Sequence, residues 1–201
     1  MLDWVAAEID ALRHTFSLRI GIAELAMRRL LLLRHAKSDR SDPGARNHDR
    51  TLNAKGRADM PKIAAYMAHH GLVPERVLIS TAVRAQETWK LIAKTLHPTP
   101  AMASDSRLYN ASAQALLQAI NDTPRKVQSL LVVGHNPGLH ELAVLLIASG
   151  DLEARERLRE KLPTGGLAVI DFALDDWSRL HPQSGRLERF VTPKLVESST
   201  D

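Results

Sequence analysis

The chain has 201 residues, enough for one domain with a substantial buried core, and its hydrophobic content of 44% excludes a mostly disordered protein. An aromatic content of 4% argues against a domain that stacks single-stranded bases, and the lack of cysteine excludes disulfide scaffolds, thiolate zinc sites and cysteine nucleophiles. The formal net charge of +4 is a mild excess that suits anionic ligands.

Residues 1–26 differ in character from the rest of the chain. Their apolar residues recur at roughly helical spacing, which predicts one or two amphipathic helices that form an appendage outside the core fold. Asp3, Glu8 and Asp10 precede the first basic residue, Arg13, whereas a secretory signal begins with basic residues. No run of about 18 apolar residues is free of charge, so we expect no membrane contact and predict a cytoplasmic location.

The core domain is predicted to span residues 27–195. Met27 opens its first strand, so a translation start at Met27 is an alternative to the longer chain. The four leucines at 30–33 form a continuous apolar run, which is typical of a strand buried on both faces. This run stops abruptly at Arg34 and His35.

Two more strand-and-helix units follow a polar loop at 38–50 and a helix that begins after Asn53 and ends near Gly71. Ser80 and Thr81 are predicted to cap the helix at 82–96, and Asn136 is predicted to cap the helix at 137–150. The other predicted elements are strands at 76–79, 101–103 and 129–133, helices at 82–96, 112–120, 137–150 and 151–161, antiparallel strands at 167–174 and 186–192, and a tail at 196–201. The order predicts an α/β fold, a three-layer α/β/α arrangement with a mostly parallel central sheet and an antiparallel edge.

Basic side chains lie where three of the predicted strands end. Arg34 and His35 follow the first strand, Arg84 lies one turn into the helix after the second, and His135 follows the strand at 129–133. Open α/β sheets bind ligands beyond the carboxyl ends of their strands, so these side chains are expected to converge on one pocket. Arginine grips phosphate oxygens in pairs and helix N-termini add backbone donors, so the pocket is expected to bind a phosphate dianion.

A histidine in such a pocket can act as a covalent nucleophile. A neutral imidazole nitrogen attacks phosphorus in line and gives a phosphohistidine enzyme, which water then hydrolyses. Fixed cations stabilise the charge of the transition state, so neither a metal nor another cofactor is expected.

Three segments resemble motifs of a known family. Arg34-His35-Ala36 is similar to the Arg-His-Gly/Ala signature of the histidine phosphatase (phosphoglycerate mutase-like) superfamily. The residues Ser-Thr-Ala-Val-Arg-Ala-Gln-Glu-Thr at 80–88 resemble its Ser-x-x-x-Arg-Ala-x-x-Thr segment, and Val-Val-Gly-His-Asn-Pro at 132–137 resembles its second-histidine motif. The Arg-His-Ala-Lys-Ser opening and the segments at 49–56 and 107–111 resemble the SixA-type phosphohistidine phosphatase branch.

The resemblance implies a phosphoglycerate mutase-like fold over residues 27–195 and a role for each of four residues. His35 would be the phosphorylated nucleophile, and Arg34 and Arg84 would hold the phosphoryl group. His135 would stabilise charge on the group in transfer. The implied activity is that of a metal-independent phosphatase that works through a phosphohistidine intermediate.

Three further residues are weaker candidates. Ser38 and Asn53 are predicted to bind substrate or to hold the loop around the pocket, and the same two possibilities stand for Asp49. His48 and Asp49 form a lone His-Asp pair without the further ligands of a metal site, so no metal is expected. No compact run of five to eight basic residues appears, so no nucleic acid partner is expected, and no feature indicates an oligomeric state.

The sequence departs from the superfamily at the general acid. Many members place a glutamate after the third strand, but residues 107–110 hold no carboxylate here, and Asp105 is expected to cap a turn or face solvent. Without a strong acid the enzyme should favour a leaving group that departs easily, such as the imidazole of phosphohistidine on a protein. The alternatives are a general phosphomonoesterase of small phosphorylated metabolites and a phospho-ligand binding module without turnover.

Overall fold

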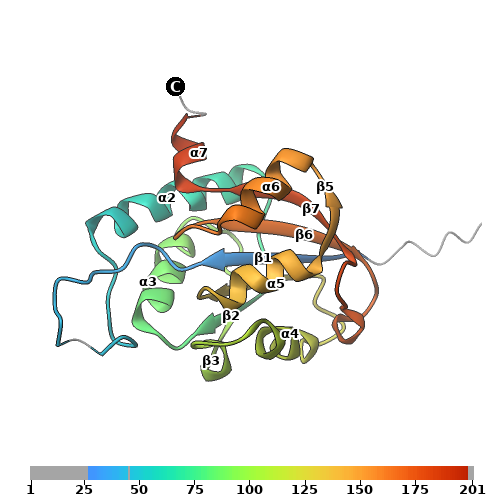
Figure 1. Cartoon of the computed structure of the whole chain (residues 1–201), viewed down its shortest axis with the longest axis horizontal. Coiled ribbons are helices and arrows are strands. Elements are labelled where there is room, and N and C mark those ends of the chain that lie inside the picture. The colour runs from blue at the N-terminus through green and yellow to red at the C-terminus, as the bar shows by residue number, and fades with distance from the viewer. Residues whose placement is uncertain (1–26, 45, 199–201) are drawn as a thin grey trace, which may run out of the picture.

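The computed structural model describes residues 27–44 and 46–198, so the predicted appendage at 1–26 lies outside the described residues. It is a three-layer α/β/α arrangement around a mixed sheet of seven strands in the order β3-β2-β4-β1-β6-β7-β5 (Figure 1). The strands are β1 (Met27–Arg34), β2 (Arg76–Ser80), β3 (Ala101–Asp105), β4 (Ser129–Gly134), β5 (Ile147–Gly150), β6 (Leu167–Ala173) and β7 (Gly185–Val191). The helices are α2 (Ala54–His69), α3 (Val83–Ile92), α4 (Ala113–Asn121), α5 (Gly138–Leu146), α6 (Leu152–Glu160) and α7 (Pro193–Ser198).

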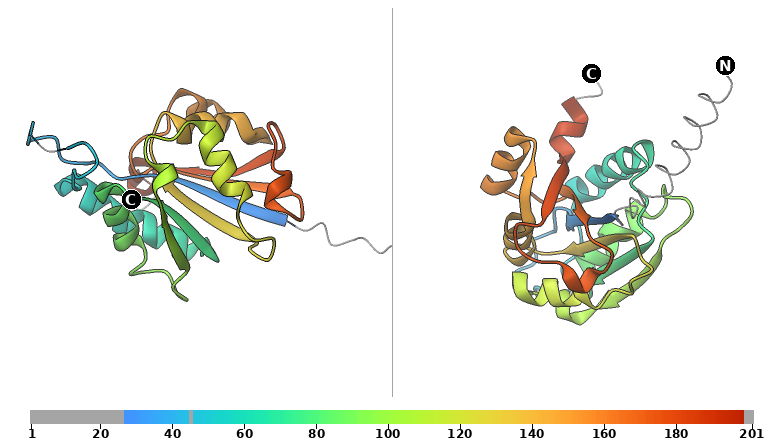
Figure 2. Two further views of the ribbon diagram at one scale, coloured as in Figure 1. Left: turned by 90° about the horizontal axis from the view of Figure 1, so that it is seen from below. Right: turned by 90° about the vertical axis from the view of Figure 1, so that its right-hand side faces the viewer.

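Strand β1 lies at the centre because its apolar run feeds both faces of the sheet. Leu30 and Leu32 pack into the core under α4, α5 and α6, whereas Leu31 and Leu33 pack into the core under α2 and α3. The two views of Figure 2 show these helix layers on opposite sides of the sheet. Burial contributes roughly 1.5–3 kcal/mol for each fully buried leucine, so this short run anchors both cores.

The predicted sheet is confirmed as mostly parallel with antiparallel strands on one side. Strands β3, β2, β4 and β1 pair in parallel, and β1 then pairs antiparallel with β6 and β6 with β7. An additional strand, β5, extends the sheet beyond β7 and pairs with it in parallel. No helix in the described part of the chain combines the length and apolar character needed to cross a bilayer.

Several predicted boundaries are wrong. The helix predicted to run to about residue 150 ends at Leu146, where the chain turns into β5 because that strand finds a partner in β7. The helix predicted over 82–96 ends at Ile92. The predicted tail at 196–201 begins inside α7, which runs to Ser198, and its last three residues lie outside the described residues.

Candidate active site

The four basic residues at the strand ends lie around one cavity of about 530 Å³. Arg34 and His35 follow β1, Arg84 lies in the first turn of α3, and His135 follows β4. Because β2, β4 and β1 are neighbours in the sheet, their carboxyl ends meet at this edge. The predicted convergence is therefore observed, and the remaining lining residues are Lys37, Ser38, Arg40, Ser41, Asn47, Arg50, Asn53, Asn110, Asn136 and Thr164.

The hydrogen bonds of His35 set its tautomer. Its Nδ1 lies 2.7 Å from the carbonyl oxygen of Ala36, and since a carbonyl only accepts, Nδ1 carries the proton. Nε2 then holds a lone pair, toward which the Nε–H of Arg84 points at 3.2 Å. The unprotonated nitrogen of the ring therefore lies beside a cationic donor.

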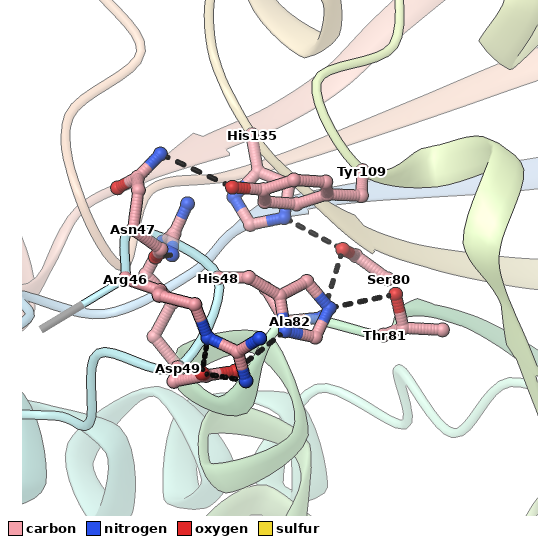
Figure 3. Close-up of polar contacts among 10 residues, drawn as sticks. Arg46, Asn47, His48, Asp49, Ser80, Thr81, Ala82, Tyr109 and His135 are labelled. Carbon is pink, nitrogen blue, oxygen red and sulfur yellow. Dashed lines mark hydrogen bonds and ion pairs between the residues drawn. The ribbon is translucent and has the colours of Figure 1, made fainter.

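His135 is held by a serine that was predicted to act as a helix cap. Its Nε2 lies 2.7 Å from Ser80 Oγ, and that oxygen also accepts the backbone N–H of Ala82 at 3.3 Å (Figure 3). The Ser80 hydroxyl is therefore free to donate its proton to Nε2, which leaves the ring proton on Nδ1. That Nδ1 is buried and finds no hydrogen-bond partner in the described part of the chain, although His135 lines the cavity. The two imidazole rings lie 5.0 Å apart between centroids.

Both histidines are neutral in this environment. Burial lowers the pKa of His35 to about 4, helped by the charges of Arg84 and Arg34 and opposed by the hydrogen bond to Ala36. Burial also lowers the pKa of His135 to about 3, with His35 and Arg84 adding to the effect. A neutral ring is what nucleophilic attack requires.

These shifts predict how the rings titrate. We expect the ring ¹⁵N signals of His35 and His135 to stay those of neutral imidazole from pH 8 to about pH 5, whereas an ordinary histidine is half protonated near pH 6.5. Their folded pKa values are lowered, so the unfolded chain binds more protons than the folded one between about pH 6.5 and 4 at His35 and between about pH 6.5 and 3 at His135. The free energy of unfolding therefore falls as pH falls through these two ranges. Spectra of the chain unfolded in urea supply the reference, and a ring that charges at pH 6 in the folded protein would contradict the assignment.

Arg84 is fixed by neighbours on two sides of its guanidinium group. Its Nη1 donates to the carbonyl oxygen of Asn47 at 2.5 Å while its Nε faces His35, and its guanidinium carbon lies 5.9 Å from the Tyr109 ring centroid. Burial is the main cause that lowers its pKa, and the charge of Arg50 adds to this, but an arginine remains protonated in proteins. A buried cation therefore lies beside the unprotonated nitrogen of His35.

The backbone that carries Arg34 and His35 is clamped from two sides. The Gly165 N–H donates to the carbonyl oxygens of both residues, at 3.1 and 3.2 Å, and Gly165 adopts a φ of +74° that favours glycine. On the other side, Thr88 Oγ1 accepts the N–H of Ala36 at 3.0 Å and donates to the carbonyl oxygen of Arg84 at 2.6 Å. This threonine ties α3 to the end of β1.

A second anchor lies in the segment before β6. Arg34 Nη1 donates to the carbonyl oxygen of Leu162 at 2.9 Å, and Asn136 Nδ2 donates to the same oxygen at 2.9 Å. The prediction that Asn136 caps a helix is therefore wrong, since its side chain bonds across the fold and α5 begins at Gly138 without a side-chain cap. The predicted caps Ser80 and Thr81 also fail, because Ala82 occupies the cap position of α3.

Residues that contact the cavity lining include some to which the sequence assigned no function. The Tyr109 ring meets the rings of His135 and His48 edge to face, with centroids 5.6 and 4.8 Å apart, and its hydroxyl accepts from Asn47 Nδ2 at 3.2 Å (Figure 3). His48 Nε2 in turn lies 3.0 Å from Thr81 Oγ1. Tyr109 belongs to a segment that resembles the SixA branch. The backbone oxygen of Asn47, which accepts a hydrogen bond from Arg84, could not be identified from the sequence because no particular side chain is needed for it.

Two of the three weaker candidates line the cavity, and the third lies outside its lining. Ser38 and Asn53 both line the cavity and both hold the loop: Ser38 Oγ accepts from Arg50 at 2.8 Å, and Asn53 Oδ1 caps α2 by accepting the Gly56 N–H at 2.9 Å. A Cβ on Gly56 would lie 2.2 Å from the Lys37 carbonyl oxygen, so glycine is required for this close approach. Asp49 lies outside the cavity lining and pairs with Arg46 and His48.

The cavity contains no carboxylate among the described residues that line it. Asp105 accepts the backbone N–H of Arg107 at 2.9 Å and forms an ion pair with the guanidinium group of Arg107. Of the two roles predicted for Asp105, the structure shows that of a turn cap. Within residues 27–44 and 46–198, no group of three histidine, aspartate or glutamate side chains gathers in the manner of a metal site. The polar groups of the cavity lining are therefore imidazoles, guanidinium groups, one lysine ammonium group, amides and hydroxyl groups.

Comparison with known proteins gives the family. Residues 30–116 match the model of the histidine phosphatase superfamily (branch 1). The chain is 35% identical over 164 residues to an uncharacterized protein of Mycobacterium tuberculosis, which covers 81% of this chain and 100% of that protein. It is similar to the structure of an Agrobacterium tumefaciens SixA protein assigned as a phosphohistidine phosphatase, with a TM-score of 0.70, 31% identity, and coverage of 83% of this chain and 98% of that one.

The fold is also shared with more distant proteins. A structure of the protein histidine phosphatase SixA complexed with tungstate matches with a TM-score of 0.65 and 22% identity, covering 84% of this chain and 99% of that one. The sequence motifs, the sheet order and these relatives agree with one another. The chain belongs to the histidine phosphatase superfamily.

Proposed function

We propose that this protein is a metal-independent phosphatase that removes the phosphoryl group from phosphohistidine on a protein. The observation that carries the proposal is the state of His35, whose Nδ1 proton is held by the Ala36 carbonyl while its Nε2 lone pair faces the cavity beside Arg84. The cytoplasmic location remains a prediction from the N-terminal charge pattern.

In the first step, His35 Nε2 attacks phosphorus and the P–N bond to the substrate ring breaks. The electron pair of that bond stays on the leaving nitrogen, and since the other ring nitrogen of the substrate is already protonated, a neutral imidazole departs. Arg34, Arg84 and the Nδ1–H of His135 are proposed to stabilise the equatorial oxygens during transfer. No carboxylic acid is needed for this departure.

In the second step, water attacks the phosphoryl group on His35. The phosphorylated ring keeps its Nδ1 proton because the Ala36 carbonyl still accepts it, so the ring leaves as neutral imidazole and its electron pair returns to Nε2. The water proton passes to phosphate and solvent. One hydrogen bond therefore prepares His35 both as nucleophile and as leaving group.

Substrate preference tests this proposal. Because no carboxylate lines the cavity, we expect kcat/KM for a phosphohistidine peptide to exceed that for an alkyl or sugar phosphate by about 100-fold or more, the range that general acid catalysis supplies when it is present. The assays are run with and without EDTA, and the rates should agree. Faster hydrolysis of alkyl phosphates would favour a general phosphomonoesterase, binding without turnover would favour a phospho-ligand module, and inhibition by EDTA would contradict metal independence.

A further inference from the structure

Five cations surround the cavity, more than one phosphoryl group requires. Arg34 and Arg84 lie beside His35, whereas Lys37, Arg40 and Arg50, which we call the outer cations, belong to the loop between β1 and α2. Figure 1 shows this loop extending from the end of β1, beyond α2 and α3. The outer cations therefore line the same cavity as His35 and belong to this loop.

The charges of the outer cations are not neutralised by ion pairs within the described residues. Acidic residues of the same loop form no ion pair with them: Asp39 and Asp42 each accept a backbone N–H two residues ahead, at 2.8 Å, and Asp49 pairs with Arg46 and His48. Asp39 is near enough for the charge of Arg50 to help lower the pKa of its carboxyl group, so Arg50 is partly balanced, whereas neither Lys37 nor Arg40 has an ion pair among the described residues. Some surface arginines away from the cavity do have acidic partners, for example Arg107 with Asp105 and Asp122 and Arg57 with Glu87. The cavity mouth is thus left with positive charge that a ligand could neutralise.

Arg50 is held in place by neutral acceptors. Its Nη2 donates to Ser38 Oγ at 2.8 Å, its Nε to the Asp39 carbonyl oxygen at 2.9 Å and its Nη1 to Asn47 Oδ1 at 3.0 Å. These bonds fix the guanidinium group beside the cavity without cancelling its charge. The loop therefore presents a built cationic surface.

The outer charges also act on the inner ones. The charge of Arg40 contributes, after burial, to the lowered pKa of Arg34, and the charge of Arg50 contributes to the lowered pKa of Arg84. Anions that bind among cations which repel one another lower the electrostatic free energy of the cluster. A phosphoryl dianion beside His35 satisfies the inner pair and leaves the outer cations for another anionic group.

We propose that Lys37, Arg40 and Arg50 form a docking surface for an acidic segment of the phosphoprotein, next to its phosphohistidine. This inference rests on the proposed function and adds a requirement for the flanking residues of the substrate. Carboxylates of the partner would mainly raise the association rate and orient the partner at the cavity mouth. Salt screens these charges, so the effect becomes smaller at high ionic strength.

The test compares two phosphohistidine peptides of equal length, one with flanking aspartate and glutamate and one with asparagine and glutamine at the same positions. We expect kcat/KM for the acidic peptide to be higher by about tenfold at low salt and the ratio to fall as salt is added. Arg40→Glu should reduce the ratio at least about fivefold, because one attraction becomes a repulsion. Lys94→Glu, an exposed position after α3, makes the same change in net charge and should leave the ratio unaltered.

The outcomes separate the inference from the function on which it rests. Equal hydrolysis of both peptides by the wild-type enzyme would overturn the docking surface and keep the phosphatase. Hydrolysis of neither peptide would overturn both. If small substrates with two anionic groups outpaced the acidic peptide and Arg40→Glu removed that advantage, the outer cations would belong to a metabolite site and the protein docking surface would be rejected. Circular dichroism of each variant checks that it folds.

Discussion

Replacing His35 with alanine is expected to abolish turnover, with a loss of roughly 10⁴-fold or more in kcat, as when a covalent nucleophile is removed. The fold should survive, because the imidazole contributes a hydrogen bond to its neighbouring carbonyl while both apolar cores lie elsewhere. We expect the free energy of unfolding to change by no more than about 1–2 kcal/mol. Denaturant titration and single-turnover kinetics measure the two quantities.

A covalent intermediate gives this prediction a second readout. Wild-type enzyme quenched at alkaline pH during turnover should carry one phosphoryl group on His35, detected by mass spectrometry, and His35→Ala should carry none. His140→Ala is the matched control, since His140 lies on α5, bonds to the Leu158 carbonyl at 2.6 Å and is not a cavity residue. Phosphate found on another side chain, or residual turnover by His35→Ala near the wild-type rate, would refute the assigned nucleophile.

Replacing Arg84 with alanine is expected to lower kcat/KM by about 10²–10³-fold, the cost of losing a preorganised charge at a transition state. Both kcat and KM should worsen, because this group faces the nucleophile and the oxyanion position together. Arg84→Lys should recover only part of the loss, since a single ammonium group cannot bridge His35 Nε2 and the Asn47 carbonyl with the geometry of the guanidinium fork.

Arg84→Ala should also change the titration of His35. The charge of Arg84 helps to lower the pKa of His35, so its removal should raise that pKa above about 4 in the ¹⁵N titration. Lys90→Ala, in the last turn of α3, serves as the control and should alter neither the kinetics nor the titration. An unchanged His35 titration in Arg84→Ala would show that the two groups do not interact in solution.

The strand ends were predictable because their signal is local. An apolar run that stops at Arg34-His35 identifies both a buried strand and its polar end, and the arrangement of parallel strands then brings Arg84 and His135 to the same edge. The nearest neighbours in sequence were enough for these assignments. The convergence itself also required that the three strands be neighbours in the sheet, which the general rule for α/β folds supplied.

The supporting contacts were not predictable because serine and asparagine have competing uses. Ser80 and Asn136 have the side chains of helix caps, but each finds a partner far along the chain, His135 for the first and the Leu162 carbonyl for the second. Strand β5 likewise forms because β7 is available to pair with it. Local sequence preferences do not predict such contacts, because the partner comes near only when the chain folds.

The clamp on the backbone of Arg34 and His35 has an evolutionary consequence. Gly165 and Thr88 fix the reacting group to the sheet and to α3, whereas Lys37, Arg40 and Arg50 sit on a connecting loop. Substitutions of these three side chains can therefore change the charge around the cavity without altering the backbone hydrogen bonds that hold Arg34 and His35. Under the proposed function, the preference for residues that flank the phosphohistidine can change in evolution while the reaction at His35 stays the same.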